Sequence, residues 1–122
     1  MDEVRQNLVS GGVPLDRVVF VPGWFDQTCT PATIEDHNIR KAAVIWVDCD
    51  LYSSAKSVLN FVTPLLQDGT VLVFDDWFNF RGSPRRGEQI AFAEWRETLS
   101  GYTFAEYQKE GPWTVAYLVS SV

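Results

Sequence analysis

The sequence predicts an α/β fold with a mixed β-sheet, in a single domain over residues 1–122. Two apolar runs, residues 42–47 (AAVIWV) and 70–74 (TVLVF), flank a segment with helical periodicity. This pattern is typical of a βαβ unit, whose two strands are parallel. Further on, the β-rich runs 102–108 and 113–119 are separated by a Glu-Gly-Pro turn, which indicates an antiparallel strand pair.

The segment between the two apolar runs has the clearest helical period. Its apolar residues fall on one helix face: Ala55, Val58, Leu59, Val62, Leu65 and Leu66. Ser53 or Ser54 can cap the first turn, and Pro64 is expected to end or kink the helix because proline has no N–H to donate. The two strands beside it are almost entirely apolar, which predicts that helices cover both of their faces.

Three further elements complete the prediction. Residues 3–9 favour a short helix that ends before a pair of glycines. The β-branched run 17–21 (RVVFV), followed by Pro-Gly, predicts an additional strand. Residues 87–99 favour a helix with Ile90, Ala91, Trp95 and Leu99 facing inward.

Composition excludes several classes of function. The formal net charge is -6, which argues against a nucleic-acid-binding surface because phosphate contacts need clustered Lys and Arg. No apolar run is long enough for a membrane span. Two cysteines, Cys29 and Cys49, do not make a disulfide framework, so we expect a reducing compartment and a cytoplasmic protein.

Acidic residues follow both strands of the βαβ unit. Asp48 and Asp50 come after the first, and Asp75 and Asp76 come after the second. Ligands of open α/β sheets bind at the carboxyl ends of the strands, so these carboxylates are expected to converge there. Such a cluster repels itself unless a cation compensates it, and oxygen ligands suit Mg²⁺, Ca²⁺ or Mn²⁺. The plainer alternative is that Asp50 and Asp76 only cap a helix or a turn.

The acidic block also carries a family resemblance. The stretch VDCDLYSSAKSVLNFVTPLLQDGTVLVFDDWFNF resembles the central block of macrocin-type O-methyltransferases. Upstream, PGWFDQT is similar to the Gly-Trp-Phe-x-x-Thr segment of that family, and downstream GEQIAFAEW is similar to its Gly-Glu-x-x-Ala-Phe segment. The three motifs occur in the family order and cover most of the chain.

The resemblance implies a class I methyltransferase, Rossmann-like sheet with strands in the order 3-2-1-4-5-7-6, of which this chain would carry the third to the seventh. It implies S-adenosylmethionine as the methyl donor and a small molecule with a hydroxyl group as the acceptor. Asp48, Asp75 and Asp76 would be ligands of Mg²⁺ or another divalent cation, and the ion would lower the pKa of the acceptor hydroxyl. Asp48 or Asp50 would take the proton as the catalytic base.

The same resemblance assigns the remaining site residues. Gly23, Trp24 and Phe25 would lie near the adenine of the methyl donor, with Asp48 also on the cofactor side. Glu88 would face the substrate. The alternatives are that Trp24 and Phe25 are ordinary core aromatics and that Glu88 is a favourable charge at a helix N-terminus.

The chain departs from the family pattern at its N-terminal side. The first two strands are not recognisable, nor is the glycine-rich loop at which a helix N-terminus cradles the donor. We therefore expect this chain alone to bind S-adenosylmethionine weakly or not at all. Without those strands, either residues 17–21 pair directly with residues 42–47 or a second chain fills the gap, and a homo-oligomer, most simply a dimer, is expected.

Two other functions fit part of the pattern. A metal-dependent glycosyltransferase also has an apolar strand that ends in Asp-x-Asp, which binds a cation and a nucleotide-sugar diphosphate. The stretch IWVDCD fits that class, whereas FDDW and GWF fit it less well. The second alternative is a non-catalytic domain that assembles through exposed sheet edges.

Overall fold

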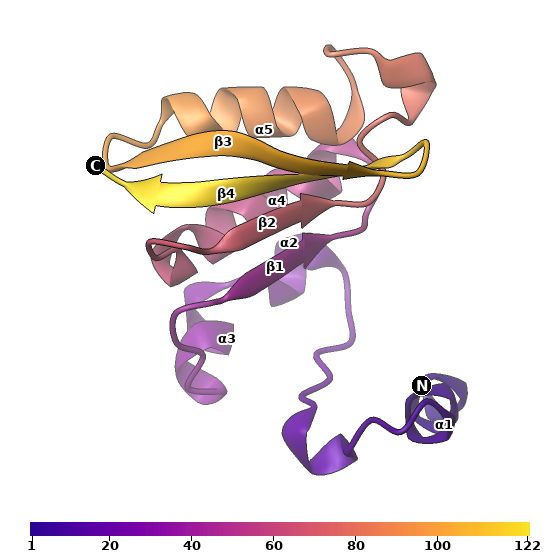
Figure 1. The fold of residues 1–122 in the computed structure, drawn as a ribbon. Helices are drawn as coiled ribbons and strands as arrows, with labels where there is room; N and C mark the ends of the chain where they lie inside the picture. Colours follow the sequence, from indigo (N-terminus) through magenta and orange to yellow (C-terminus); the bar gives the residue numbers. More distant parts are fainter.

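Four strands form one mixed sheet in the computed structural model, which describes residues 1–122 (Figure 1). They are β1 (Val44–Val47), β2 (Val71–Phe74), β3 (Tyr102–Glu110) and β4 (Thr114–Ser121). Their order in the sheet is β1-β2-β4-β3, with β1 and β2 parallel and β4 antiparallel to both of its neighbours. The predicted α/β class, the parallel βαβ unit and the antiparallel C-terminal pair are therefore confirmed.

The helices are α1 (Asp2–Ser10), α2 (Phe25–Thr28), α3 (Pro31–Asp36), α4 (Tyr52–Val62) and α5 (Gly87–Glu97). Single 3₁₀ turns lie at Leu15–Arg17, Thr63–Leu65 and Phe80–Gly82. Helices α4 and α5 pack against each other on one face of the sheet, while α1 stands apart from it (Figure 1). No helix has the length and apolar character needed to cross a membrane.

Helix α4 begins earlier than a serine cap would place it. Its first residue is Tyr52 and its cap position is Leu51, which makes no side-chain capping bond, so Ser53 and Ser54 lie inside the first turn. The helix ends at Val62, and Pro64 falls in the 3₁₀ turn that follows, as the missing proline N–H predicts. Its buried residues, Ala55, Leu59 and Val62, are three of those that its periodicity placed on the inner face.

An aromatic cluster fills the space between α5 and the sheet. The ring of Phe92 lies 5.1 Å from that of Phe74, 4.6 Å from that of Tyr117 and 5.4 Å from that of Phe104, measured between centroids. Phe92 itself is fully buried, so its whole side chain contributes to the hydrophobic stabilisation of the fold. This packing fixes the N-terminus of α5 beside the carboxyl ends of β1 and β2.

The prediction of a strand at residues 17–21 is wrong. Leu15–Arg17 form a 3₁₀ turn, and the residues after it run without regular structure toward α2. Val19 is 61% exposed, and Phe20 packs under the guanidinium of Arg5 at 4.5 Å. A β-branched run becomes a strand only where a neighbour pairs its backbone groups, and here no strand does so. The direct pairing of this run with residues 42–47 is therefore not formed.

Two-sided burial of β1 is also wrong. Ile45 and Val47 are buried against α4, but Val44 and Trp46 are 60% and 59% exposed on the opposite face. β1 is an edge strand, since the sheet order gives it a neighbour only at β2. An apolar run predicts burial only when something covers the second face, and no helix of this structure does.

Candidate metal centre

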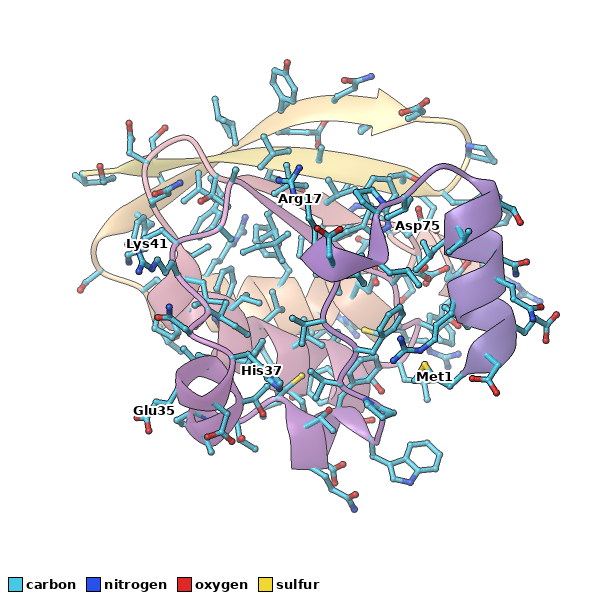
Figure 2. All side chains as sticks on the ribbon, turned by 90° about the horizontal axis from the view of Figure 1, so that it is seen from below. Met1, Arg17, Glu35, His37, Lys41 and Asp75 are labelled. Atoms are coloured by element: carbon cyan, nitrogen blue, oxygen red, sulfur yellow. The ribbon has the colours of Figure 1, made fainter.

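The parallel register of β1 and β2 determines where the acidic residues lie. Val47 pairs with Phe74, so the next residues, Asp48 and Asp75, leave the two strands side by side. The N–H of Asp75 donates to the carbonyl of Val47 at 2.9 Å and extends the ladder to this point. Figure 2 shows Asp75 far from Lys41 and His37, which belong to the segment that enters β1. The acids thus follow the carboxyl ends of the strands.

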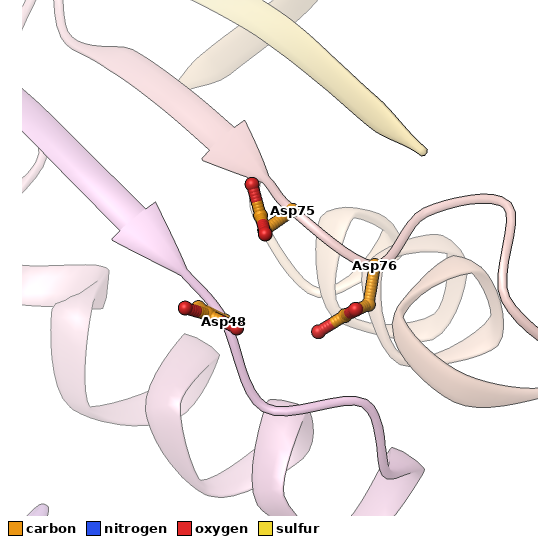
Figure 3. A group of neighbouring side chains, drawn as sticks. All are labelled: Asp48, Asp75 and Asp76. Carbon is orange, nitrogen blue, oxygen red and sulfur yellow. The ribbon is translucent and has the colours of Figure 1, made fainter. Parts of the chain in front are cut away.

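Three of the four aspartates converge. Asp48, Asp75 and Asp76 each offer a carboxylate oxygen within 4.8 Å of the others (Figure 3). Asp75 and Asp76 are partly buried and Asp48 is exposed, so the cluster opens to solvent on the side of β1. The Oγ1 of Thr114, at the start of β4, donates to Asp75 Oδ1 at 3.3 Å and holds that carboxylate in place.

Asp50 lies beside the cluster and is joined to it by hydrogen bonds. Its backbone N–H donates to Asp76 Oδ2 at 3.2 Å. The Asn79 Nδ2 donates to Asp50 Oδ1 at 2.5 Å and to Asp76 Oδ1 at 2.9 Å. Asp50 also has a φ of +48°, an uncommon conformation for a residue other than glycine, which turns the chain toward Asp76.

The electrostatics of the cluster favour a positive ion. Burial raises the pKa of Asp76, and the negative charges of Asp50 and Asp48 raise it further. Burial together with the surrounding carboxylates, that of Glu88 first among them, raises the pKa of the Cys49 thiol to about 12, so it stays protonated at neutral pH. A divalent cation among these carboxylates would offset the repulsion that adds to the effect of burial in both shifts.

Glu88 is placed differently from the expectation that it faces a substrate. Its side chain is only 1% exposed, in the first turn of α5, and its Oε2 accepts the backbone N–H of Asp76 at 3.1 Å. Its Oε1 has no hydrogen-bond partner. Burial, with the charges of Asp76 and Asp48, raises its pKa to about 8. The carboxyl group therefore lies beneath the acidic cluster and connects α5 to the backbone of Asp76, which leaves it no surface to offer a substrate.

We expect Glu88→Gln to alter how stability depends on pH. The pKa of Glu88 rises from 4.5 in its ordinary state to about 8 in the fold, so its contribution to stability is greatest below pH 4.5 and declines as the pH rises toward 8. Glutamine keeps the acceptor for Asp76 and cannot ionise. When the pH is raised from 5 to 9, the free energy of unfolding of the variant should increase relative to that of the wild type. The expected difference is at least about 1.4 kcal/mol, the equivalent of one pKa unit.

Urea unfolding at the two pH values in buffer with EDTA measures this difference. The control is Glu97→Gln at the exposed end of α5, which should follow the wild type at both pH values. Parallel curves for wild type and Glu88→Gln would show that the buried carboxyl titrates near its ordinary pKa.

The residues expected beside the adenine lie at the start of α2: Gly23 and Trp24 precede the helix and Phe25 is its first residue. Trp24 is 76% exposed, and with Phe25 it borders a hollow of about 340 Å³ whose far wall is Ser53, Ser54 and Ser57 of α4. Phe25 and Asp48 together line a second hollow of about 320 Å³ beside β1. Gly23 has a φ of +148°, and a side chain there would meet the methyl of Thr28 at 2.6 Å. Phe25 and Asp48 thus share one hollow, whereas Trp24 borders only the other.

Two residues of the site were missed from the sequence. Asn79 bridges Asp50 and Asp76, and Thr114 orients Asp75. The signal for Asn79 was its position three residues after Asp76, where the backbone turns back. Thr114 gave no local signal, since it comes from the last strand and reaches the site only through the sheet pairing.

The chain thus combines a mixed sheet with paired acids after two adjacent parallel strands. A family model described as macrocin O-methyltransferase (TylF) matches residues 1–98. The chain therefore belongs to the macrocin O-methyltransferase family. The order β1-β2-β4-β3 corresponds to the fourth, fifth, seventh and sixth strands of the sheet that this resemblance implied. Family membership favours the methyltransferase prediction over the glycosyltransferase alternative.

Two curated relatives and one solved structure to which the chain is similar are also O-methyltransferases. The chain is 35% identical over 77 residues, 63% of its length, to "8-demethyl-8-(2,3-dimethoxy-alpha-L-rhamnosyl)-tetracenomycin-C 4'-O-methyltransferase" of Streptomyces olivaceus, and the match covers 28% of that protein. It is 34% identical over 74 residues, 61% of its length, to "Mycinamicin III 3''-O-methyltransferase" of Micromonospora griseorubida, covering 27% of that protein. The solved structure of the O-methyltransferase NovP superposes with a TM-score of 0.74 at 24% identity, over 98% of this chain and 44% of NovP.

Proposed function

We propose that this chain carries the cation-binding part of the active site of an S-adenosylmethionine-dependent O-methyltransferase. The observation that supports this most is the convergence of Asp48, Asp75 and Asp76 within 4.8 Å. The chain spans only about 27–28% of the length of these curated relatives. The activity therefore belongs, in this proposal, to a site that is shared with residues outside the matched region.

The donor set fits a hard divalent cation. Ligand oxygens lie about 2.0–2.6 Å from Mg²⁺ or Ca²⁺, so two ligands of one ion are at most about 4–5 Å apart. The three carboxylate oxygens lie within 4.8 Å of one another, which is inside the limit for Ca²⁺. Around Mg²⁺, with ligands at about 2.1 Å, the carboxylates would have to approach to about 4.2 Å. Three carboxylates without histidine or cysteine suit Mg²⁺, Mn²⁺ or Ca²⁺ rather than zinc.

Each acid has a role in the proposal. Asp48, Asp75 and Asp76 would hold the ion, with Thr114 and Asn79 fixing the carboxylates of Asp75 and Asp76. When bound, the cation supplies Lewis acidity that lowers the pKa of an acceptor hydroxyl. Asp50 then takes the hydroxyl proton on Oδ2, because its Oδ1 already accepts from Asn79.

The methyl donor would lie on the β1 side of the cluster. Phe25 lines the hollow that reaches Asp48, and Gly23 and Trp24 form the turn that leads to it. An aromatic ring there provides a stacking surface for adenine. The names of the two curated relatives describe methylation of an oxygen on a rhamnosyl-bearing tetracenomycin and on mycinamicin, so we extend the acceptor class to hydroxyl groups of small, sugar-bearing molecules.

The test combines ion binding with donor binding. Electron paramagnetic resonance of Mn²⁺ should show one bound ion per chain, displaced by Mg²⁺, and transfer of a labelled methyl group from S-adenosylmethionine to glycosylated acceptors should need that ion. Donor binding by this chain alone is expected to be weak. Failure to bind any divalent ion would contradict the proposal, and binding of a nucleotide-sugar without S-adenosylmethionine would favour a glycosyltransferase.

We also propose that the chain forms a homodimer through β1 and the open sheet face beside it. The outer edge of β1 has no strand partner, and Trp46, Val71 and Val73 border an apolar hollow on the uncovered face. Free strand edges and exposed apolar faces favour association. The free thiols of Cys29 and Cys49 support a reducing, cytoplasmic location for this assembly.

Trp46→Lys is expected to convert the dimer to a monomer, because it places a charge on the open face. Sedimentation velocity at micromolar concentration measures the change. Trp24→Lys is the matched control, since Trp24 is also exposed (76%, against 59% for Trp46) but on a different surface, and its replacement should leave the dimer intact. A wild-type chain that sediments as a 13.8 kDa monomer would contradict the dimer.

A further inference from the structure

The segment between Asp76 and α5 carries three arginines whose side chains have no partner. Arg81, Arg85 and Arg86 are all exposed, and none forms an ion pair, a side-chain hydrogen bond or a cation–π contact. The structure contains one ion pair, Lys109 with Glu106. In a chain with 16 acidic and 10 basic residues, three neighbouring arginines that form no ion pair make a local basic patch.

The backbone of this segment is strained. Phe80 and Arg81 have φ values of +56° and +61°, although neither is glycine. Bulky residues rarely adopt this conformation, and where they do the surroundings must compensate a cost of about 1–3 kcal/mol each. Such strain is concentrated at binding and catalytic sites. Here it turns the Phe80 ring back against the start of α5.

The strained segment is held directly against the acidic site. A side chain at Gly87 would lie 2.8 Å from the Phe80 ring and 2.9 Å from the carbonyl oxygen of Asp50. Only a glycine allows these three groups to come so close. The arginine segment and the loop of Asp50, the proposed base, therefore share a border.

Two hollows at this border share Phe80 and Arg86 in their lining. The first, about 360 Å³, has an apolar wall that includes Leu51, Tyr52 and Ile90, and a basic wall of Arg85 and Arg86. The second, about 540 Å³, is lined by Phe80, Arg81, Ser83 and Arg86. An apolar surface next to unpaired guanidinium groups matches a ligand with a ring body and an attached oxyanion.

We propose that these hollows form the acceptor subsite and that the acceptor carries a phosphate or carboxylate on an aromatic or alicyclic body. The guanidinium groups of Arg85 and Arg86 bind the oxyanion, while Leu51 and Phe80 contact the ring. This inference rests on the proposed methyl transfer at the acidic cluster, because it names the class of molecule that enters there.

Binding of 1-naphthyl phosphate to the intact chain tests the proposal, followed by the fluorescence of the naphthyl ring in buffer with EDTA. Saturable binding is expected, and Arg85→Gln and Arg86→Gln should each weaken it at least about tenfold, the loss expected for a charge-assisted hydrogen bond. Arg40→Gln is the control, since Arg40 is exposed on the segment before β1 and should leave the affinity unchanged.

Two matched probes distinguish the contribution of the ring to binding from that of the oxyanion. 1-Naphthol, which has the ring without the oxyanion, should bind at least about tenfold more weakly than the phosphate, and 1-naphthoate shows whether a carboxylate can replace it. Equal affinities for naphthol and naphthyl phosphate, or unchanged affinities in both arginine variants, would overturn the subsite. Because EDTA removes divalent ions, such a failure would leave the cation site and the proposed methyl transfer standing.

Discussion

Asp48→Asn is expected to lower the affinity of the chain for Mn²⁺ by about 100-fold or more, since even partners that only orient a metal ligand are worth about 10–100-fold. The carboxylate of Asp48 is the ligand from β1, while Asp75 and Asp76 both come from the end of β2. Its loss leaves two ligands from a single loop, and the amide that replaces it carries no charge to balance the ion. Paramagnetic resonance of Mn²⁺ titrated into the variant measures the loss.

The control for this experiment is Asp36→Asn at the end of α3, where the carboxylate is exposed and distant from the cluster. It should bind Mn²⁺ like the wild type. Because Asp48 is an exposed residue, the variant should also keep the unfolding midpoint of the metal-free wild type. Wild-type Mn²⁺ affinity in Asp48→Asn would remove Asp48 from the set of ligands.

Phe92→Ala is expected to reduce the free energy of unfolding by about 3–5 kcal/mol, the usual cost of removing a buried aromatic ring. Phe92 contacts rings from β2, β3 and β4, so its removal leaves a cavity that several elements border. Domains of this size are stable by only about 5–15 kcal/mol in total. The variant should therefore unfold at a much lower urea concentration, followed by circular dichroism.

Tyr107→Ala provides the comparison, because Tyr107 is an aromatic residue of the same sheet that is 63% exposed. Its replacement should change the stability by no more than about 0.5 kcal/mol. Similar losses in the two variants would mean that the cluster around Phe92 is not the principal core.

The sequence predicted the elements whose environment is local. The periodicity between residues 55 and 66 predicted the inner face of α4, and the apolar run 70–74 predicted β2, because these segments meet their partners within the βαβ unit. It failed at residues 17–21 and at the outer face of β1. Both errors have the same cause. A run of β-branched or apolar residues forms a strand, or is buried, only where a neighbouring strand pairs with it or a helix covers it.

The same distinction, between contacts within the βαβ unit and contacts with other elements, applies to the candidate site. The convergence of Asp48 with Asp75 was predictable, because parallel strands in a βαβ unit present their carboxyl ends together. The buried position of Glu88 was not, since it depends on how α5 packs against the loop of Asp76. Nor could spacing show that Gly87 lies close to both the Phe80 ring and the carbonyl of Asp50, a residue far earlier in the chain.

The pairing of Val47 with Phe74 has a consequence for how this sequence can change over time. The distance between Asp48 and Asp75 depends on that pairing and not on the length of the crossover, so insertions in the turn after α4 would leave the acids where they are. A single deletion within β1, by contrast, would turn Asp48 to the opposite face of the sheet, because side chains alternate along a strand. Insertions and deletions are therefore tolerated in the crossover between β1 and β2, whereas the number of residues in each of these two strands must stay the same.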